Sequence, residues 1–254
     1  MGGVPVGPSA VERKNALAPA IVVLVGAALL VAALILPWYS FDLSGSGSNN
    51  GSLVMEADLD AFELCVSGSG ANSGISVSTG QCALYMAISP GTGILFFIPA
   101  LLLVLSLILG LVAGALGFKA SNDSGPVVRK KVRRPYALTR LSLVLLLVSI
   151  ILFLIFDGIV GGILANQLCA PGSSTSGWGG ACDYTLNSSS GGSVSGTMTW
   201  GPSFGFFLAI LSFVLLLVGA IRLRGYFRAM EPFDPAHAQL TAPPVAPPPA
   251  YPGY

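Results

Sequence analysis

The chain has 254 residues, of which 53% are hydrophobic and only 9% are charged, with a formal net charge of +1. A soluble domain carries about 25% charged residues, so the composition excludes an ordinary soluble protein. It indicates instead a protein that is embedded in a membrane.

Four apolar runs are long enough to cross a bilayer, whose hydrocarbon core of about 30 Å needs about 20 helical residues. In lipid, each backbone N–H and C=O must find its partner within its own segment, so each run is predicted to be a helix. The first run exceeds the apolar part of a cleaved signal peptide, and we expect it to remain. The expected spans are residues 17–38, 93–118, 141–164 and 204–223. The fold class that follows is an all-α membrane bundle of four transmembrane helices over residues 17–224.

Basic residues predict the orientation of this bundle. All 12 Lys and Arg lie in the N-terminal segment 1–16, in the loop 119–140, or at the end of the fourth span, and none lies in 39–92 or 165–203. Because cytoplasmic flanks collect Lys and Arg, both termini and the loop 119–140 are expected to be cytoplasmic. The loops 39–92 and 165–203 are then outer loops, and the expected location is the plasma membrane.

All four cysteines lie in the two outer loops, where oxidation is possible. Cys65 and Cys82 are in the first loop, and Cys169 and Cys182 are in the second. Disulfides persist outside the cell, so two bridges are predicted. Four cysteines allow three connectivities, of which one bridge within each loop is the simplest. A zinc site is the competing interpretation, but the spacings and the lack of an outer histidine disfavour it, and no metal site is expected.

Between the cysteines the apolar pattern changes from helical to alternating. Ile75 and Val77 alternate with serines in "ISVS", and residues 183–200 predict a hairpin with Val194, Met198 and Trp200 on one face. The two outer loops are therefore expected to share one small disulfide-stapled extracellular β-sheet. Because a sheet edge can add a neighbouring strand, we predict that Ile75, Ser76 and Val77 form an edge for assembly.

The first outer loop carries acidic residues and no basic residue, so it would attract cations. These acids are Asp42, Glu56, Asp58, Asp60 and Glu63. Asp157 is the acidic residue inside a predicted helix, in its outer third. Such residues are costly and often functional, although near the interface Asp157 could also reach water or cap a backbone amide.

The inner side carries the basic run "RKKVRR", which is either a topology determinant or a contact for anionic lipid headgroups. Its charged residues are Arg129, Lys130, Lys131, Arg133 and Arg134. The segment 225–254 is rich in proline and is predicted to be a disordered cytoplasmic tail. Within it, "PPAY" (Pro248 to Tyr251) matches a ligand of proline-motif-binding domains.

Nothing in the sequence favours catalysis. The lone histidine, His237, lies in the tail, and the serines of the outer loops have no base beside them. We expect no catalytic residue, no cofactor, and no nucleic-acid partner. Membrane lipids and other membrane proteins, including further copies of the chain, are the expected partners.

The order of the outer-loop motifs resembles the claudin family and the wider claudin-like tetraspan superfamily. Trp38 lies at the outer end of the first helix in "LPWYS", Phe62 and Cys65 form aromatic-x-x-Cys in "FELC", and Cys82 and Tyr85 follow in "CALY". The topology agrees from about residue 17 to 224. Phe62 replaces the second Trp of the family motif, and the second cysteine pair is not a claudin feature.

This resemblance implies a structural, adhesion or assembly role for the outer sheet, with Trp38, the aromatic residue and the disulfide holding the sheet on the helix ends. For Trp38, a place in the interfacial aromatic belt is the other interpretation. A pore-forming or transport-accessory protein is the alternative function. Gap-junction-like channels also have inner termini and cysteines in both outer loops, but their cysteines usually link the two loops.

Overall fold

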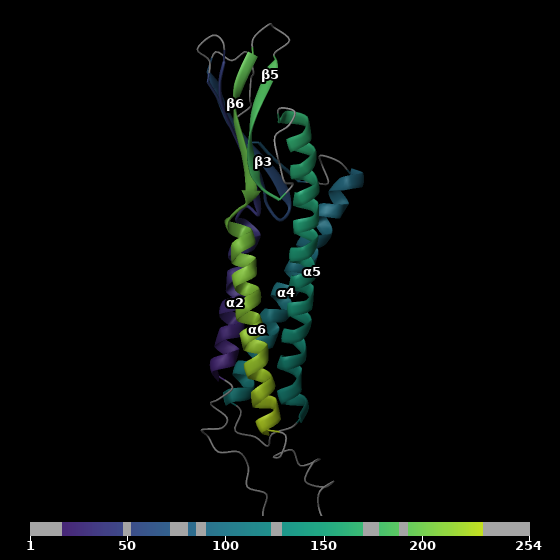
Figure 1. The fold of residues 1–254 in the computed structure, drawn as a ribbon. Coiled ribbons are helices and arrows are strands. Elements are labelled where there is room, and N and C mark those ends of the chain that lie inside the picture. The colour runs from purple at the N-terminus through teal and green to yellow at the C-terminus, as the bar shows by residue number, and fades with distance from the viewer. Residues whose placement is uncertain are drawn as a thin grey trace, which may run out of the picture.

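The computed structural model describes residues 17–47, 52–71, 81–84, 90–122, 129–169, 178–187 and 193–230. Its four long helices run side by side, and a β-sheet stands at one end of them (Figure 1). The helices are α2 (Leu17–Ile35), α4 (Pro90–Asn122), α5 (Arg129–Leu168) and α6 (Phe204–Met230). Each contains a stretch that is long and apolar enough to cross a membrane, and on this criterion the chain is a multi-pass membrane protein.

Three helices extend beyond the apolar runs that predicted them. α5 begins inside the predicted basic loop, and its 40 residues span about 60 Å, twice the hydrocarbon core. α6 continues to Met230, so residues 225–230 are helical and the prediction of a tail from 225 onward is wrong there. The reason is that Lys and Arg are good helix formers outside lipid. The remainder of the predicted tail, from 231, lies outside the described residues.

Small residues and serines hold the helices together. A Cβ added to Gly114 of α4 would lie 2.6 Å from the side chain of Leu24 in α2, so this pair of helices needs a glycine there. Between α4 and α5, Ser106 Oγ donates to the carbonyl of Ser142 at 2.9 Å, and Ser142 Oγ donates to the carbonyl of Ser106 at 2.8 Å. These buried hydroxyls therefore find partners without water.

The sheet has six antiparallel strands in the order β4-β3-β2-β1-β6-β5. Their bounds are β1 Tyr39–Gly47, β2 Ser52–Leu59, β3 Glu63–Ala71, β4 Gln81–Leu84, β5 Gly180–Asn187 and β6 Ser193–Pro202. β1 pairs with β6, so the segments after α2 and before α6 share one sheet, and the predicted hairpin in 183–200 is confirmed. Because the described residues include a six-stranded sheet, the predicted class of an all-α bundle applies to the helices alone.

One face of the sheet forms an apolar core against α5. Tyr39, Phe41 and Leu43 alternate inward along β1 and are at most 4% exposed. The last turns of α5, through Val160 and Leu164 among others, pack against this face. The predicted inward residues of β6 (Val194, Met198 and Trp200) are also buried, so their predicted face is confirmed. α5 thus supports the sheet as well as the bundle, as Figure 1 shows.

A pair of glycines lets β1 and β6 pass close to each other. Gly45 is opposite Gly196, which in turn is opposite Tyr184 of β5. The Tyr184 side chain reaches across, and its hydroxyl oxygen lies 2.7 Å from the position that a Cβ of Gly45 would take. A Cβ on Gly196 would meet the carbonyl oxygen of Ser44 and the Cα of Gly45. Close strand approach and the burial of Tyr184 therefore depend on these glycines.

We predict that Gly196→Ala destabilises the protein by about 1–3 kcal/mol, because the new methyl group forces β1 away from β6. Gly201→Ala in the same strand is the matched control, since its Cβ would lie 3.9 Å from the Cα of Gly179, which is ordinary van der Waals contact. Thermal unfolding of the detergent-solubilised variants measures the difference. Equal melting temperatures would show that the two strands tolerate separation.

Candidate functional site

Trp38 lies at the junction between the helices and the sheet. Its indole is 1% exposed, stacks on Phe153 of α5 with ring centroids 4.3 Å apart, and meets Phe206 of α6 edge-on at 6.2 Å. Its Nε1 donates a hydrogen bond to the carbonyl of Ala33 in α2 at 2.6 Å. The side chain is therefore an interior contact of three helices, and not an aromatic of the lipid-facing interfacial belt.

The backbone beside this indole joins further elements. The Trp38 N–H donates to the carbonyl of Leu59, at the end of β2, at 2.8 Å. The Ser203 N–H, just before α6, donates to the Trp38 carbonyl at 2.9 Å. Phe62 packs near Phe97 of α4, with ring centroids 6.0 Å apart. Trp38 and Phe62 thus lie where the sheet meets the helix ends, whereas Tyr85 lies outside the described residues.

The two disulfides join Cys65 to Cys82 and Cys169 to Cys182, so the simplest predicted connectivity is confirmed. Cys65 and Cys82 are directly opposite each other in β3 and β4, and the bridge ties the short edge strand β4 to the sheet. Cys169 follows the end of α5, so the second bridge ties α5 to β5. Each bridge is therefore a staple within one loop.

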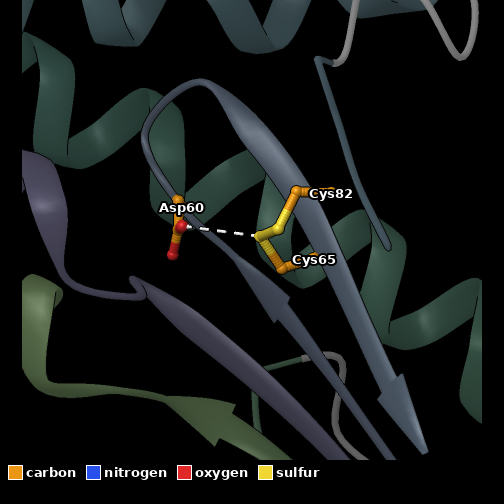
Figure 2. The surroundings of a disulfide bond; sticks show 3 residues. All are labelled: Asp60, Cys65 and Cys82. Carbon is orange, nitrogen blue, oxygen red and sulfur yellow. Dashed lines mark hydrogen bonds between the residues drawn. A yellow bond between two sulfur atoms is a disulfide. The ribbon is translucent and has the colours of Figure 1, made fainter. Parts of the chain in front are cut away.

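Two carboxylates lie beside the first bridge. Oδ2 of Asp60 is 4.0 Å from Sγ of Cys65 (dashed line in Figure 2). A carboxylate oxygen of Glu63 and the two sulfurs lie within 4.8 Å of one another. A disulfide sulfur carries no hydrogen, so it can only accept a bond from a protonated Asp60. For the same reason the two sulfurs are not the thiolates that a zinc site would need.

The five acids of the first outer loop lie together, and we call them the acidic strip: Asp42, Glu56, Asp58, Asp60 and Glu63. Asp42 in β1 is directly opposite Glu56 in β2. Burial first, and then the charges of Asp58 and Glu63, raise the pKa of Asp60 to about 6. Burial, followed by the charges of Glu56 and Asp42, also raises the pKa of Asp58. The sequence placed these acids in one loop, and the strand register makes them neighbours.

Asp157 lies one turn of α5 beyond Phe153, between the bundle and the sheet. It is 3% exposed, so the interfacial water that one interpretation offered it does not reach it. Within the described residues its Oδ1 has no hydrogen-bond partner. Burial first, and then the charge of Asp157, raises the pKa of Tyr39, which places this tyrosine close to the acid. Asp157 is thus an interior acid at the base of the sheet.

Some predicted site residues cannot be placed. Ile75, Ser76 and Val77, the predicted assembly edge, lie outside the described residues, as do the side chains of Arg129, Lys130 and Lys131. Arg133 and Arg134 are exposed on α5. The partners of Trp38, namely Phe153 and Phe206, could not be predicted from the sequence, because an aromatic residue inside an apolar run gives no signal of its contact.

Comparisons with known proteins add no family. No protein-family model matches the chain, and no curated protein matches it. The resemblance to claudins therefore stays a prediction from the sequence.

We predict that Trp38→Ala lowers the free energy of unfolding by about 3–5 kcal/mol, because it leaves a cavity between three helices. Trp38→Phe keeps an aromatic ring but leaves the Ala33 carbonyl without its donor, and should cost about 1–3 kcal/mol. Trp178, which is 50% exposed, provides the control Trp178→Ala with a smaller loss. Thermal unfolding followed by circular dichroism ranks the three. An equal loss at both tryptophans would contradict the junction role.

The acidic strip predicts that acid stabilises the sheet. Because the folded state raises the pKa of Asp60 to about 6, the folded protein binds protons more tightly than the unfolded chain. Stability should therefore fall as the pH rises from about 4 to 6 and stay low above that. Asp60→Asn should raise the melting temperature at pH 7 and flatten this slope, whereas Asp183→Asn on β5 should leave it in place. Melting temperatures of both variants between pH 4 and pH 8 measure this pH dependence. An unchanged slope in Asp60→Asn would show that a group other than Asp60 causes it.

Proposed function

We propose that this chain is a claudin-like integral membrane protein of the plasma membrane, with cytoplasmic termini and a sheet that faces outward for a structural, adhesion or assembly role. The distribution of charge supports this orientation. The segments that form the sheet contain no Lys or Arg, while the opposite end of the bundle carries exposed basic residues such as Lys119, Arg140 and Arg228. Two disulfides at the sheet end also suit an oxidising environment.

The observation that carries the assembly role is the edge strand β4. All four of its residues, Gln81–Leu84, are exposed. In the part of the chain that the structure describes, β4 pairs with β3 on one side and with no strand on the other. The opposite edge differs, because Cys169, just after α5, forms an isolated antiparallel β-bridge with Tyr184 of β5. An open edge can add a strand from a neighbour.

A second copy of the chain is the first partner in this proposal, and another membrane protein is the next. Ile75, Ser76 and Val77 lie outside the described residues, between β3 and β4 in sequence, and remain part of the proposed edge. The basic run from Arg129 to Arg134 would meet anionic lipids, and the tail would meet a proline-motif-binding domain. No catalysis, cofactor or nucleic acid enters this function.

A pore-forming or transport-accessory role is the second candidate, and the acidic strip favours it. Asp42 and Glu56 are opposite each other with no basic residue in either outer loop, so the strip would favour cations where subunits surround a path. Cation flux into liposomes that contain the purified protein separates this role from assembly alone. Flux that is lost in Asp42→Asn/Glu56→Gln would place the pore first.

We predict that Gln81→Lys/Ala83→Lys lowers self-association about tenfold, because charged lysines on the edge strand β4 oppose strand addition. The control Thr197→Lys/Thr199→Lys adds the same charge at exposed positions of the sheet, but on the central strand β6. Single-molecule counting in bilayers measures the dimer fraction. Labelling of a cysteine at Ser46 by an impermeant reagent, and of one at the exposed Asn122 only after permeabilisation, checks the orientation.

Two results would count against the assembly role. A wild-type protein that is monomeric at native density has no homotypic edge to block. Equal effects of the edge and central lysines would show that charge, and not strand addition, changes the association.

A further inference from the structure

The ends of α5 and α6 that lie away from the sheet are joined by an aromatic stack. The rings of Tyr136 in α5 and Phe227 in α6 are nearly parallel, with an interplanar angle of 12° and centroids 6.5 Å apart. The guanidinium carbon of Arg140 lies 5.8 Å from the centroid of the Tyr136 ring. This cation–π contact holds one arginine at the contact between the two helices.

Helical geometry brings further arginines to the same contact. Arg133 precedes Tyr136 by three residues and Arg140 follows it by four, so both share its face of α5. On α6, Arg224 precedes Phe227 by three residues, and Arg228 follows directly. All four arginines are exposed. We call Arg133, Arg140, Arg224 and Arg228 the seam arginines.

The helices run in opposite directions, and this sets the heights of the seam arginines (Figure 1). At 1.5 Å per residue, Arg140 lies about 6 Å and Arg224 about 4.5 Å from the aromatic stack, both towards the sheet. Arg140 directly precedes the apolar run of α5, and Arg224 follows closely after that of α6. The two are therefore level with the end of the hydrocarbon core, which is the depth of headgroup phosphates.

No carboxylate neutralises these charges within the described part of the chain. The described acids are Asp157, near the sheet end of α5, and those of the sheet, namely Asp42, Glu56, Asp58, Asp60, Glu63 and Asp183. Guanidinium groups suit phosphate because their planar donors match its oxygens in pairs. Basic sites between transmembrane helices on the cytoplasmic side bind anionic headgroups in this way.

We propose that the seam arginines bind the headgroup phosphate of an anionic phospholipid along the contact between α5 and α6, with Arg140 and Arg224 as the principal pair. The site shares Arg133 with the basic run Arg129–Arg134 at the start of α5, but it differs from that run because it needs two helices and their aromatic stack. It is independent of the role of the sheet.

The same end of the bundle provides matched controls. Arg222 of α6 precedes Phe227 by five residues, so at about 100° per residue it lies about 140° around its helix from the stack. Lys119 lies on α4, outside the two helices of the seam. Both are exposed. Lys119→Gln/Arg222→Gln thus removes the same charge from the same end of the bundle but away from the seam.

Binding of phosphatidylglycerol to the full chain in a neutral detergent, measured by native mass spectrometry, tests the site, with phosphatidylcholine as the uncharged reference lipid. Arg140→Gln/Arg224→Gln should weaken phosphatidylglycerol binding about 25-fold, which is about fivefold for each charge. The control pair should change it less than about threefold. Phosphatidylcholine binding should not change in either variant.

Further variants separate the site from its scaffold. Arg140→Lys/Arg224→Lys should restore most of the affinity, since the charge remains, whereas Tyr136→Leu should weaken binding by releasing Arg140 from its ring. Gel filtration and circular dichroism show that each variant is folded. Equal losses in the seam and control pairs would overturn the proposal in favour of diffuse attraction, and displacement of the lipid by equimolar soluble glycerol phosphate would overturn the lipid as the ligand.

Discussion

The packing of one indole between two kinds of structure is the constraint on which the rest of the molecule depends. The helices need no sheet to satisfy their backbones, and the sheet needs an apolar partner for its inner face. Trp38 lies between them, with its ring on Phe153, its Nε1 on the carbonyl of Ala33, and its own backbone bonded towards β2 and α6. The positions of β1 and α6 relative to the bundle are set at this residue.

The long helix α5 continues past this junction and alongside the sheet. Its last turns cover the inner face of the sheet, and the bridge from Cys169 to Cys182 ties its end to β5. The other end of the sheet has no such support in the described residues, and there β4 is held to β3 by the bridge from Cys65 to Cys82. Among the described residues, one edge is thus tied to a helix, whereas the edge strand β4 pairs with β3 alone. This asymmetry is the physical basis for assigning contacts with partners to the β4 edge.

Charge also distinguishes the sheet end of the molecule from the opposite end of the helices. The acidic strip gathers like charges at one end, where Asp42 and Glu56 are opposite each other although such pairs destabilise a sheet. The arginines gather at the other end, where the stack of Tyr136 on Phe227 joins α5 to α6. Between them the described helices carry Asp157 as a buried acid. A membrane protein with this polarity has one end suited to cations and one suited to anionic lipid.

The sequence by itself determined the features that depend on local composition. Apolar runs of sufficient length must be helices in lipid, so the four spans could be predicted, as could the inward face of β6 from its alternation. The cysteines predicted their pairing because each pair lies within one loop. β1 could also have been found, since Tyr39, Phe41 and Leu43 alternate with polar residues in the same way. Only the tertiary structure decided the burial of Asp157, the neighbours of Asp60, the passage of Tyr184 over two glycines, and the seam of α5 and α6. Each of these depends on the register or packing of segments far apart in the chain, and such contacts leave no periodic signal in either segment alone.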